Sequence, residues 1–213
     1  MAVTLDVFAG SRVTNTGIAT IDESLTVASN SNRALFVLVG NDSSLTVSSV
    51  SYTVGSGGVW AQVGSRTNGV HINEIWSSVA PSTGSVTIRV TLSGNITVDC
   101  NSNVYSLYNV DQTTPADGYA SAISGNTITA VQTSGGMAIG HFQGISSFGA
   151  ITAGVEDFAN INNEDWRAAH NSASGTLTYT NTPGGVTIDA CNVRQVASAA
   201  GFLLSVPLTL VIV

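Results

Sequence analysis

Charged residues are scarce in this chain, and lysine is absent altogether. Only 9% of its 213 residues are charged, against about 25% in an ordinary soluble domain. Thirteen acidic and six basic residues give a net charge of −7. A nucleic-acid-binding surface needs clustered basic residues that neutralise phosphates. Nucleic-acid binding is therefore not expected, because the arginines are scattered singly at positions 12, 33, 66, 89, 167 and 194.

Cysteine is also rare. Cys100 and Cys191 lie far apart and form no CxxC pair, which excludes a disulfide-dense scaffold and gives no zinc-site pattern. Both fall in expected strands, so a single bridge between them stays open, with buried free thiols favoured. The first ten residues lack the basic start and the apolar run of a cleavable secretory signal, so we expect a protein that is not exported by that route.

Residues suited to catalysis are few and isolated. His71, His141 and His170 have no HxH or HxxxH companion, and the patterns GxSxG and GxxxxGK[ST] do not occur. Acid–base, nucleophilic and nucleotide chemistry need such groups or loops in defined arrangements. We therefore expect no enzyme activity, no catalytic residue and no cofactor.

One acidic cluster lies in segment 155–171, where carboxylates could offer oxygen ligands to calcium. The DxDxDG spacing of a calcium loop is missing, so the cluster predicts a solvated acidic loop and no metal site. The segment has helix-like content and lies between strand-like regions, which indicates a long connection with one helical turn. The carboxylates are Glu156, Asp157, Glu164 and Asp165.

Helical periodicity is nearly absent, whereas Val, Ile, Thr and Tyr recur in short runs that alternate with Ser, Asn and Gly. Such runs are typical of half-buried strands. The apolar run 34–40 indicates a central strand that is covered on both faces. The chain is thus predicted to be all-β, an antiparallel β-sandwich of jelly-roll type with about a dozen short strands. The expected strands are 3–9, 18–27, 34–40, 46–54, 58–63, 70–79, 85–92, 96–108, 126–132, 136–145, 175–180 and 185–196.

The last residues form an uncharged apolar segment, 196–213, which meets the lower limit for a membrane span. Pro207 in its middle, the β-branched residues near its end and the lack of a following Lys or Arg favour a strand or arm over a membrane anchor. We divide the chain into a β-sandwich domain, 1–197, and an apolar C-terminal strand or arm, 198–213. The arm needs cover from water, so we expect it to complete its own sandwich or to cross to a partner subunit, with exchange between subunits preferred. The predicted interface residues are Phe202, Leu203, Leu204, Val206, Leu208, Leu210, Ile212 and Val213.

Aromatic residues raise the question of a sugar-stacking platform, because exposed aromatic rings on a β-sandwich bind carbohydrate. The chain has three tryptophans and five tyrosines, and we expect most of them to pack inside. Trp76 lies in a strand whose alternation does not decide its exposure. Glycan binding therefore stays open as an alternative.

Four segments follow one another in a recognisable order. They are SNRALFVLVG at 31–40, VSSVSYTVGSGGVWAQVGS at 47–65, NEIWSSVAPSTGSVTIRVTLSG at 73–94 and VYSLYNVDQTTP at 104–115. This order resembles a β-sandwich domain family that occurs in phage virion structural proteins and in large bacterial surface proteins. The resemblance covers about residues 1–197, and the apolar segment lies outside it.

The resemblance implies structural roles for particular residues. Asn32 and Arg33 would lead into the central strand, the segment 47–65 would form a hairpin, and Asp111 with Gln112 would form the turn before the second half. Pro81 and Gly84 would form the turn that joins two paired strands, as their φ preferences allow.

The resemblance also implies a function. We expect a non-enzymatic phage virion structural protein, most simply a capsid decoration or cement subunit or an accessory head–tail subunit. It would assemble in the host cytoplasm and reside in the virion, with major capsid or tail proteins and further copies of itself as partners. The alternative is a carbohydrate- or receptor-binding module of a tail fibre or surface adhesin. Neither nucleic acid nor a membrane is an expected partner.

Overall fold

The computed structural model describes residues 1–14, 17–144, 148–162, 164–180 and 187–197. Every regular element within these ranges is a β-strand, and all strand pairs are antiparallel. The prediction of an all-β antiparallel sandwich is confirmed, and the described residues form sixteen strands where about a dozen were expected. The jelly-roll type of connection stays a prediction. No helix long and apolar enough to cross a membrane occurs in the part of the chain described.

The strands divide into two series of eight. The first series is β1 (Thr4–Thr14), β2 (Thr20–Val27), β3 (Ala34–Asn41), β4 (Val47–Val54), β5 (Ala61–Asn68), β6 (His71–Val79), β7 (Gly84–Leu92) and β8 (Asp99–Tyr108). The second series is β9 (Ala116–Ala122), β10 (Thr127–Thr129), β11 (Met137–Gly144), β12 (Ile151–Ala153), β13 (Val155–Asn162), β14 (Glu164–Asn171), β15 (Thr176–Tyr179) and β16 (Thr187–Val193).

The two series have the same sheet order. The first forms a five-stranded sheet β1-β8-β3-β6-β5 and a three-stranded sheet β2-β7-β4. The second forms β9-β16-β11-β14-β13 and β10-β15-β12, which is the first order with eight added to each strand number. The sequence shows no repeat of fixed period, so this internal repeat is visible only in the strand order.

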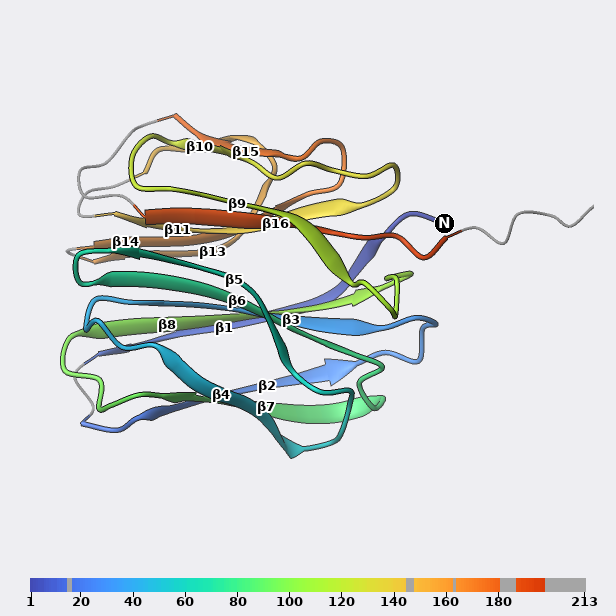
Figure 1. Cartoon of the computed structure of the whole chain (residues 1–213), viewed down its shortest axis with the longest axis horizontal. Helices are drawn as coiled ribbons and strands as arrows, with labels where there is room; N and C mark the ends of the chain where they lie inside the picture. Colours follow the sequence, from blue (N-terminus) through green and yellow to red (C-terminus); the bar gives the residue numbers. More distant parts are fainter. Residues whose placement is uncertain (15–16, 145–147, 163, 181–186, 198–213) are drawn as a thin grey trace, which may run out of the picture.

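The four sheets stack as layers (Figure 1), with the two five-stranded sheets in the middle and a three-stranded sheet on each outer face. Contacts of β16 with β5 and β6, and of β11 with β3, join the two halves. The chain therefore forms one stack in which the two series face each other through their larger sheets.

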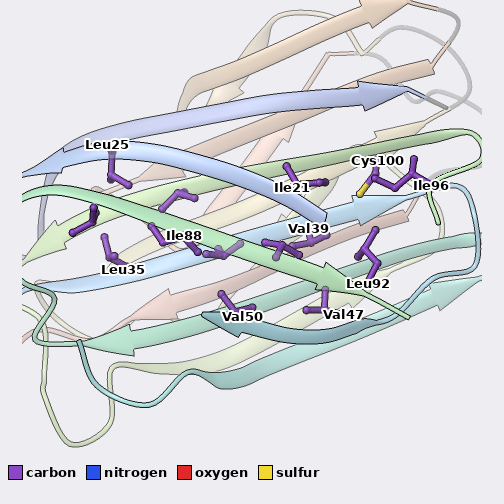
Figure 2. Close-up of a cluster of buried hydrophobic side chains, with 14 of the residues drawn as sticks. Ile21, Leu25, Leu35, Val39, Val47, Val50, Ile88, Leu92, Ile96 and Cys100 are labelled. Atoms are coloured by element: carbon purple, nitrogen blue, oxygen red, sulfur yellow. The ribbon is translucent and has the colours of Figure 1, made fainter. Parts of the chain in front are cut away.

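The first outer layer follows directly from the alternation in the sequence. In β2, buried residues such as Ile21 and Leu25 alternate with exposed ones, and in β7 Val86, Ile88 and Val90 are buried. Since successive side chains of a strand point to opposite faces, both strands turn one apolar face toward the central sheet. Figure 2 shows this cluster, which extends from Leu25 at one end to the region of Ile96 and Cys100 at the other.

The predicted central strand is confirmed as β3, whose eight residues are all buried. It lies in the middle of the first five-stranded sheet, between β8 and β6. Leu35 and Val37 pack into the cluster of Figure 2, whereas Phe36 and Leu38 pack against the second half of the chain. A strand that is covered on both faces favours a continuous apolar run, as residues 34–39 show.

Three expectations from the sequence are wrong. The segment 155–171 is not a loop with a helical turn, because it forms β13 and β14, two antiparallel strands paired with each other. The segment 47–65 is not a hairpin, because β4 pairs with β7 and β5 pairs with β6. Pro81 and Gly84 do not join two paired strands, because they lie between β6 in a five-stranded sheet and β7 in a three-stranded one. Alternation shows the faces of a strand but does not identify its partner.

Candidate functional site: an edge groove beside a buried polar seam

An open groove lies between strand β5 and the segment that connects the two halves. Two adjoining hollows, of about 380 and about 180 Å³, share four lining residues, so we treat them as one groove. The described lining side chains are small, apolar or hydroxylic, apart from two amides, Gln62 and Gln112, and a single acid, Asp117. The groove is lined by Val59, Ala61, Gln62, Val63, Ser77, Ser78, Val79 and residues 112–119.

β5, whose first residues line the groove, is the last strand of its sheet. It pairs with β6 on one side, and no described strand pairs with its other side. A bulge interrupts the ladder between Gln62 and Gly64. The ring of Tyr119, in β9, packs over Gly64 so closely that a Cβ added at Gly64 would lie 2.3 Å from Tyr119 Cδ2. The edge of one sheet thus meets the edge of the other and leaves a channel beside their contact.

The far wall of the groove is held by side-chain hydrogen bonds to backbone. Asp111 accepts from the N–H groups of Thr113 (2.8 Å) and Thr114 (3.1 Å), which lowers the pKa of the Asp111 carboxyl. The Gln112 amide donates to the carbonyl oxygens of Arg33 (3.1 Å) and Val110 (2.9 Å). The far wall is therefore a turn whose conformation is held by these hydrogen bonds.

The residues singled out by the resemblance meet at this wall. Arg33 precedes β3, as expected, and its guanidinium donates to the Pro81 carbonyl oxygen at 3.0 and 3.1 Å. Asn32 adopts a left-handed conformation, with φ of 53°, which asparagine tolerates better than most residues. Gln112 then ties the turn before β9 to Arg33. The expected roles of Arg33 and Gln112 as entry and turn residues are confirmed.

The last described residues run alongside the same wall. The Arg194 N–H donates to the Pro115 carbonyl oxygen, and its own carbonyl accepts from the Asp111 N–H, each at 2.9 Å. Two residues later, the Val196 N–H donates to the Asn109 carbonyl oxygen at 2.9 Å. The chain thus passes antiparallel to 109–115, away from Pro115. The predicted interface residues of the apolar segment, 202–213, lie outside the described residues.

A second feature, the polar seam, lies between the two five-stranded sheets. Residues that face this interface are apolar toward one end of each strand and polar toward the other. On the face of β3 that meets this interface, Leu38 is followed by Gly40. On the corresponding face of β11, Ile139 is followed by His141 and Gln143. All of the polar seam residues are at most 1% exposed; they are Asn73, Asn101, Asn103, His141, Gln143, Trp166, Thr187 and Asp189.

Two titratable side chains of the seam are opposite each other on neighbouring strands. His141 in β11 is the register partner of Asp189 in β16. Burial lowers the pKa of His141 to about 3, because the charged imidazolium would lose its hydration. Burial raises the pKa of Asp189 well above its usual value; Asn73 acts in the opposite direction, and the charge of Glu74 adds to the rise. Both shifts favour the neutral form of the side chain.

The other two histidines each contact a carboxylate. His71 Nδ1 lies 2.6 Å from Asp42 Oδ1 and 2.7 Å from the amide nitrogen of Gln143, so it links the two halves. His170 Nδ1 lies 2.8 Å from Asp157 Oδ2. The three histidines are thus in different surroundings, and no cluster of three or more His, Cys, Asp or Glu suited to a metal occurs among the described residues.

The prediction of a solvated acidic loop is wrong, because the segment forms strands and three of its four carboxylates have partners within the fold. The side chain of the fourth, Glu164, lies outside what the structure describes. Asp165 is 1% exposed and pairs with Arg167 at 2.5 Å, and Glu156 pairs with the same guanidinium at 2.5 Å. Asp157 accepts a hydrogen bond from the buried hydroxyl of Tyr105 at 2.9 Å. These carboxylates are part of the structure of the second half. Their partners lie on other strands or two residues away, so the charge pattern alone gave no indication of them.

Both cysteines are buried free thiols, as favoured from the sequence. The aromatic rings pack inside to the extent expected: Trp166, Tyr105 and Tyr179 are fully buried, and no aromatic side chain within the described ranges is classed as exposed. A stacking platform for sugars would need exposed rings.

Comparison with known proteins gives no relative. No family model matches the chain, and neither a curated protein nor a solved structure matches it significantly.

The groove was not predicted from the sequence, because its walls come from β5 and a turn about fifty residues further along the chain.

Proposed function

We propose that this protein is a non-enzymatic structural subunit of a phage virion, which binds other subunits through its groove and its open sheet edge. The observation that carries the proposal is the contrast between inside and surface. The buried polar side chains of the seam are enclosed between two sheets. The groove beside the unpaired edge of β5 offers backbone and small side chains suited to contact with another chain.

The composition supports the same role. A chain with 9% charged residues has few long, mobile side chains, so less side-chain entropy is lost when its surface is covered. Serine, threonine, asparagine and glycine, whose side chains are short or absent, are abundant instead. Within the virion, a capsid decoration or cement subunit, or an accessory head–tail subunit, is the form of the proposal that we favour.

The proposal is tested by particle binding. Purified protein is mixed with phage particles that lack it, and binding is followed by sedimentation and by electron microscopy. We expect saturable labelling at symmetry-related positions. Failure to label particles, together with specific binding to defined glycans on an array, would overturn the proposal in favour of a receptor-binding module.

A further inference from the structure

We propose that the groove beside β5 binds residues 202–213 of a second copy of this chain, which add a strand to the edge of β5. The inference rests on the proposed function, since it names the partner that the groove takes during assembly. Strand addition of this kind obtains affinity from main-chain hydrogen bonds and specificity from pockets for alternate side chains.

The open edge of β5 supplies the first argument. β5 spans eight residues, Ala61–Asn68, and its first three, Ala61–Val63, line the groove. An unpaired edge presents N–H and C=O groups in the spacing of a strand. Residues 208–213 consist of apolar and β-branched residues, LTLVIV, which favour an extended conformation. The edge therefore offers unpaired N–H and C=O groups, and the segment favours the extended conformation that would pair with them.

The composition of the groove supplies the second argument. Its lining contains no basic residue and one acid, Asp117, whose carboxylate already lies 3.5 Å from Arg194. The segment 198–213 has no charged residue at all. Val59, at the groove, is 91% exposed, so the groove offers apolar surface that an uncharged apolar strand would cover. An acidic peptide would find no basic side chain in the described lining.

The path of the chain supplies the third argument and favours a second copy as the source of the segment. Between Arg194 and Val196 the chain runs from Pro115 toward Asn109, and so leaves the groove behind. To fill its own groove, the segment would have to reverse. Sixteen residues follow residue 197, and in extended form they span about 50 Å. That reach is sufficient for a neighbouring copy, and reciprocal exchange gives a closed pair with twofold symmetry.

The experiment uses the full chain and three variants of it. The groove variant carries Val59→Asp and Ala61→Asp, the segment variant carries Leu208→Asp and Leu210→Asp, and the control carries Val98→Asp at an exposed valine away from the groove. Self-association is measured by sedimentation velocity and mass photometry, and folding of each variant by circular dichroism and thermal unfolding.

We expect the native chain and the control to self-associate equally. The groove and segment variants should each associate more weakly by about tenfold or more, the factor that corresponds to about 1.4 kcal/mol. Mixing the two variants should restore pairs, because the groove of one and the segment of the other form one intact contact. Recovery on mixing is a result that a general loss of folding cannot produce.

Three outcomes would overturn the inference. If the groove variant associates normally while the segment variant does not, the segment binds elsewhere, and the proposed virion role stands without this site. If mixing restores nothing, the two surfaces are not partners. A third outcome is a native chain that stays monomeric, whose residues 202–213 resist proteolysis but are cleaved in the groove variant. In that case the groove binds the segment of its own chain. Failure of the proposed function itself would instead appear as failure to label particles.

Discussion

His141 occupies the space in which a side chain at Gly40 would lie. A Cβ added at Gly40 would be 2.2 Å from His141 Cε1 and 2.5 Å from Trp166 Cζ3, and real Cβ atoms do not approach other atoms so closely. Gly40 lies in β3 of the first half, and the two rings lie in β11 and β14 of the second half. The absence of one side chain therefore sets how closely the two halves approach.

The first prediction concerns this contact. Gly40→Ala should destabilise the protein by about 1–3 kcal/mol, because the added methyl overpacks a closed interface. Gly94→Ala is the control, since its Cβ would meet only the end of the Leu45 side chain, at 3.2 Å. Urea unfolding measures both. Equal stability of the two variants would show that the seam tolerates an added methyl.

The second prediction concerns stability at low pH. Because the pKa of His141 is about 3 in the folded chain and 6.5 in the unfolded one, the unfolded state binds more protons between these values. Stability should therefore fall as pH decreases from 6.5 toward 3, by up to about 5 kcal/mol from this group. His141→Gln should show a shallower fall in urea unfolding over the same range. An unchanged slope would mean that His141 is protonated in the fold.

The third prediction concerns Asp189, whose contribution to stability changes with pH in the opposite direction to that of His141. The pKa of Asp189 is raised in the folded state, from 3.8, so the folded state holds a proton that the unfolded state releases. The stability contributed by this group should fall as pH rises above 3.8. Asp189→Asn keeps the neutral shape, so its stability relative to the native chain should increase with pH. A constant difference between pH 5 and 8 would show that Asp189 is ionised when folded.

The fourth prediction concerns the thiols. Cys100 and Cys191 are both 0% exposed, and burial raises the pKa of each. Only the thiolate reacts readily, so neither cysteine should react with a disulfide reagent in the native protein. Both should react in denaturant without prior reduction, because both are free. Fast labelling of the native chain would indicate that the core opens locally.

The fifth prediction concerns Arg167, which pairs with Asp165 and Glu156 while only 6% of its side chain is exposed. Arg167→Ala should destabilise the protein by about 3–5 kcal/mol, since it leaves the buried Asp165 carboxylate unpaired. Arg89→Ala, which breaks an exposed pair with Asp22, should have little effect on the urea midpoint. Similar midpoints for the two variants would contradict the structural role of Arg167.

The sequence determined much of this protein at the level of single strands. Alternation in β7 assigned Val86, Ile88 and Val90 to the core, and the continuous apolar run of β3 placed that strand between two layers. Isolated cysteines indicated buried free thiols. These features are local, because the period of a strand and the burial of its residues are written in adjacent positions.

The tertiary structure alone decided how the strands pair and what they enclose. Nothing near Asp165 in the local pattern distinguished a buried ion pair from a solvated loop, and the groove exists only because β5 and residues 112–119 meet. The repeated sheet order is likewise invisible in the residues themselves. The physical reason is that a strand's pattern states which face is apolar, whereas its partner depends on the packing of segments far apart in the chain.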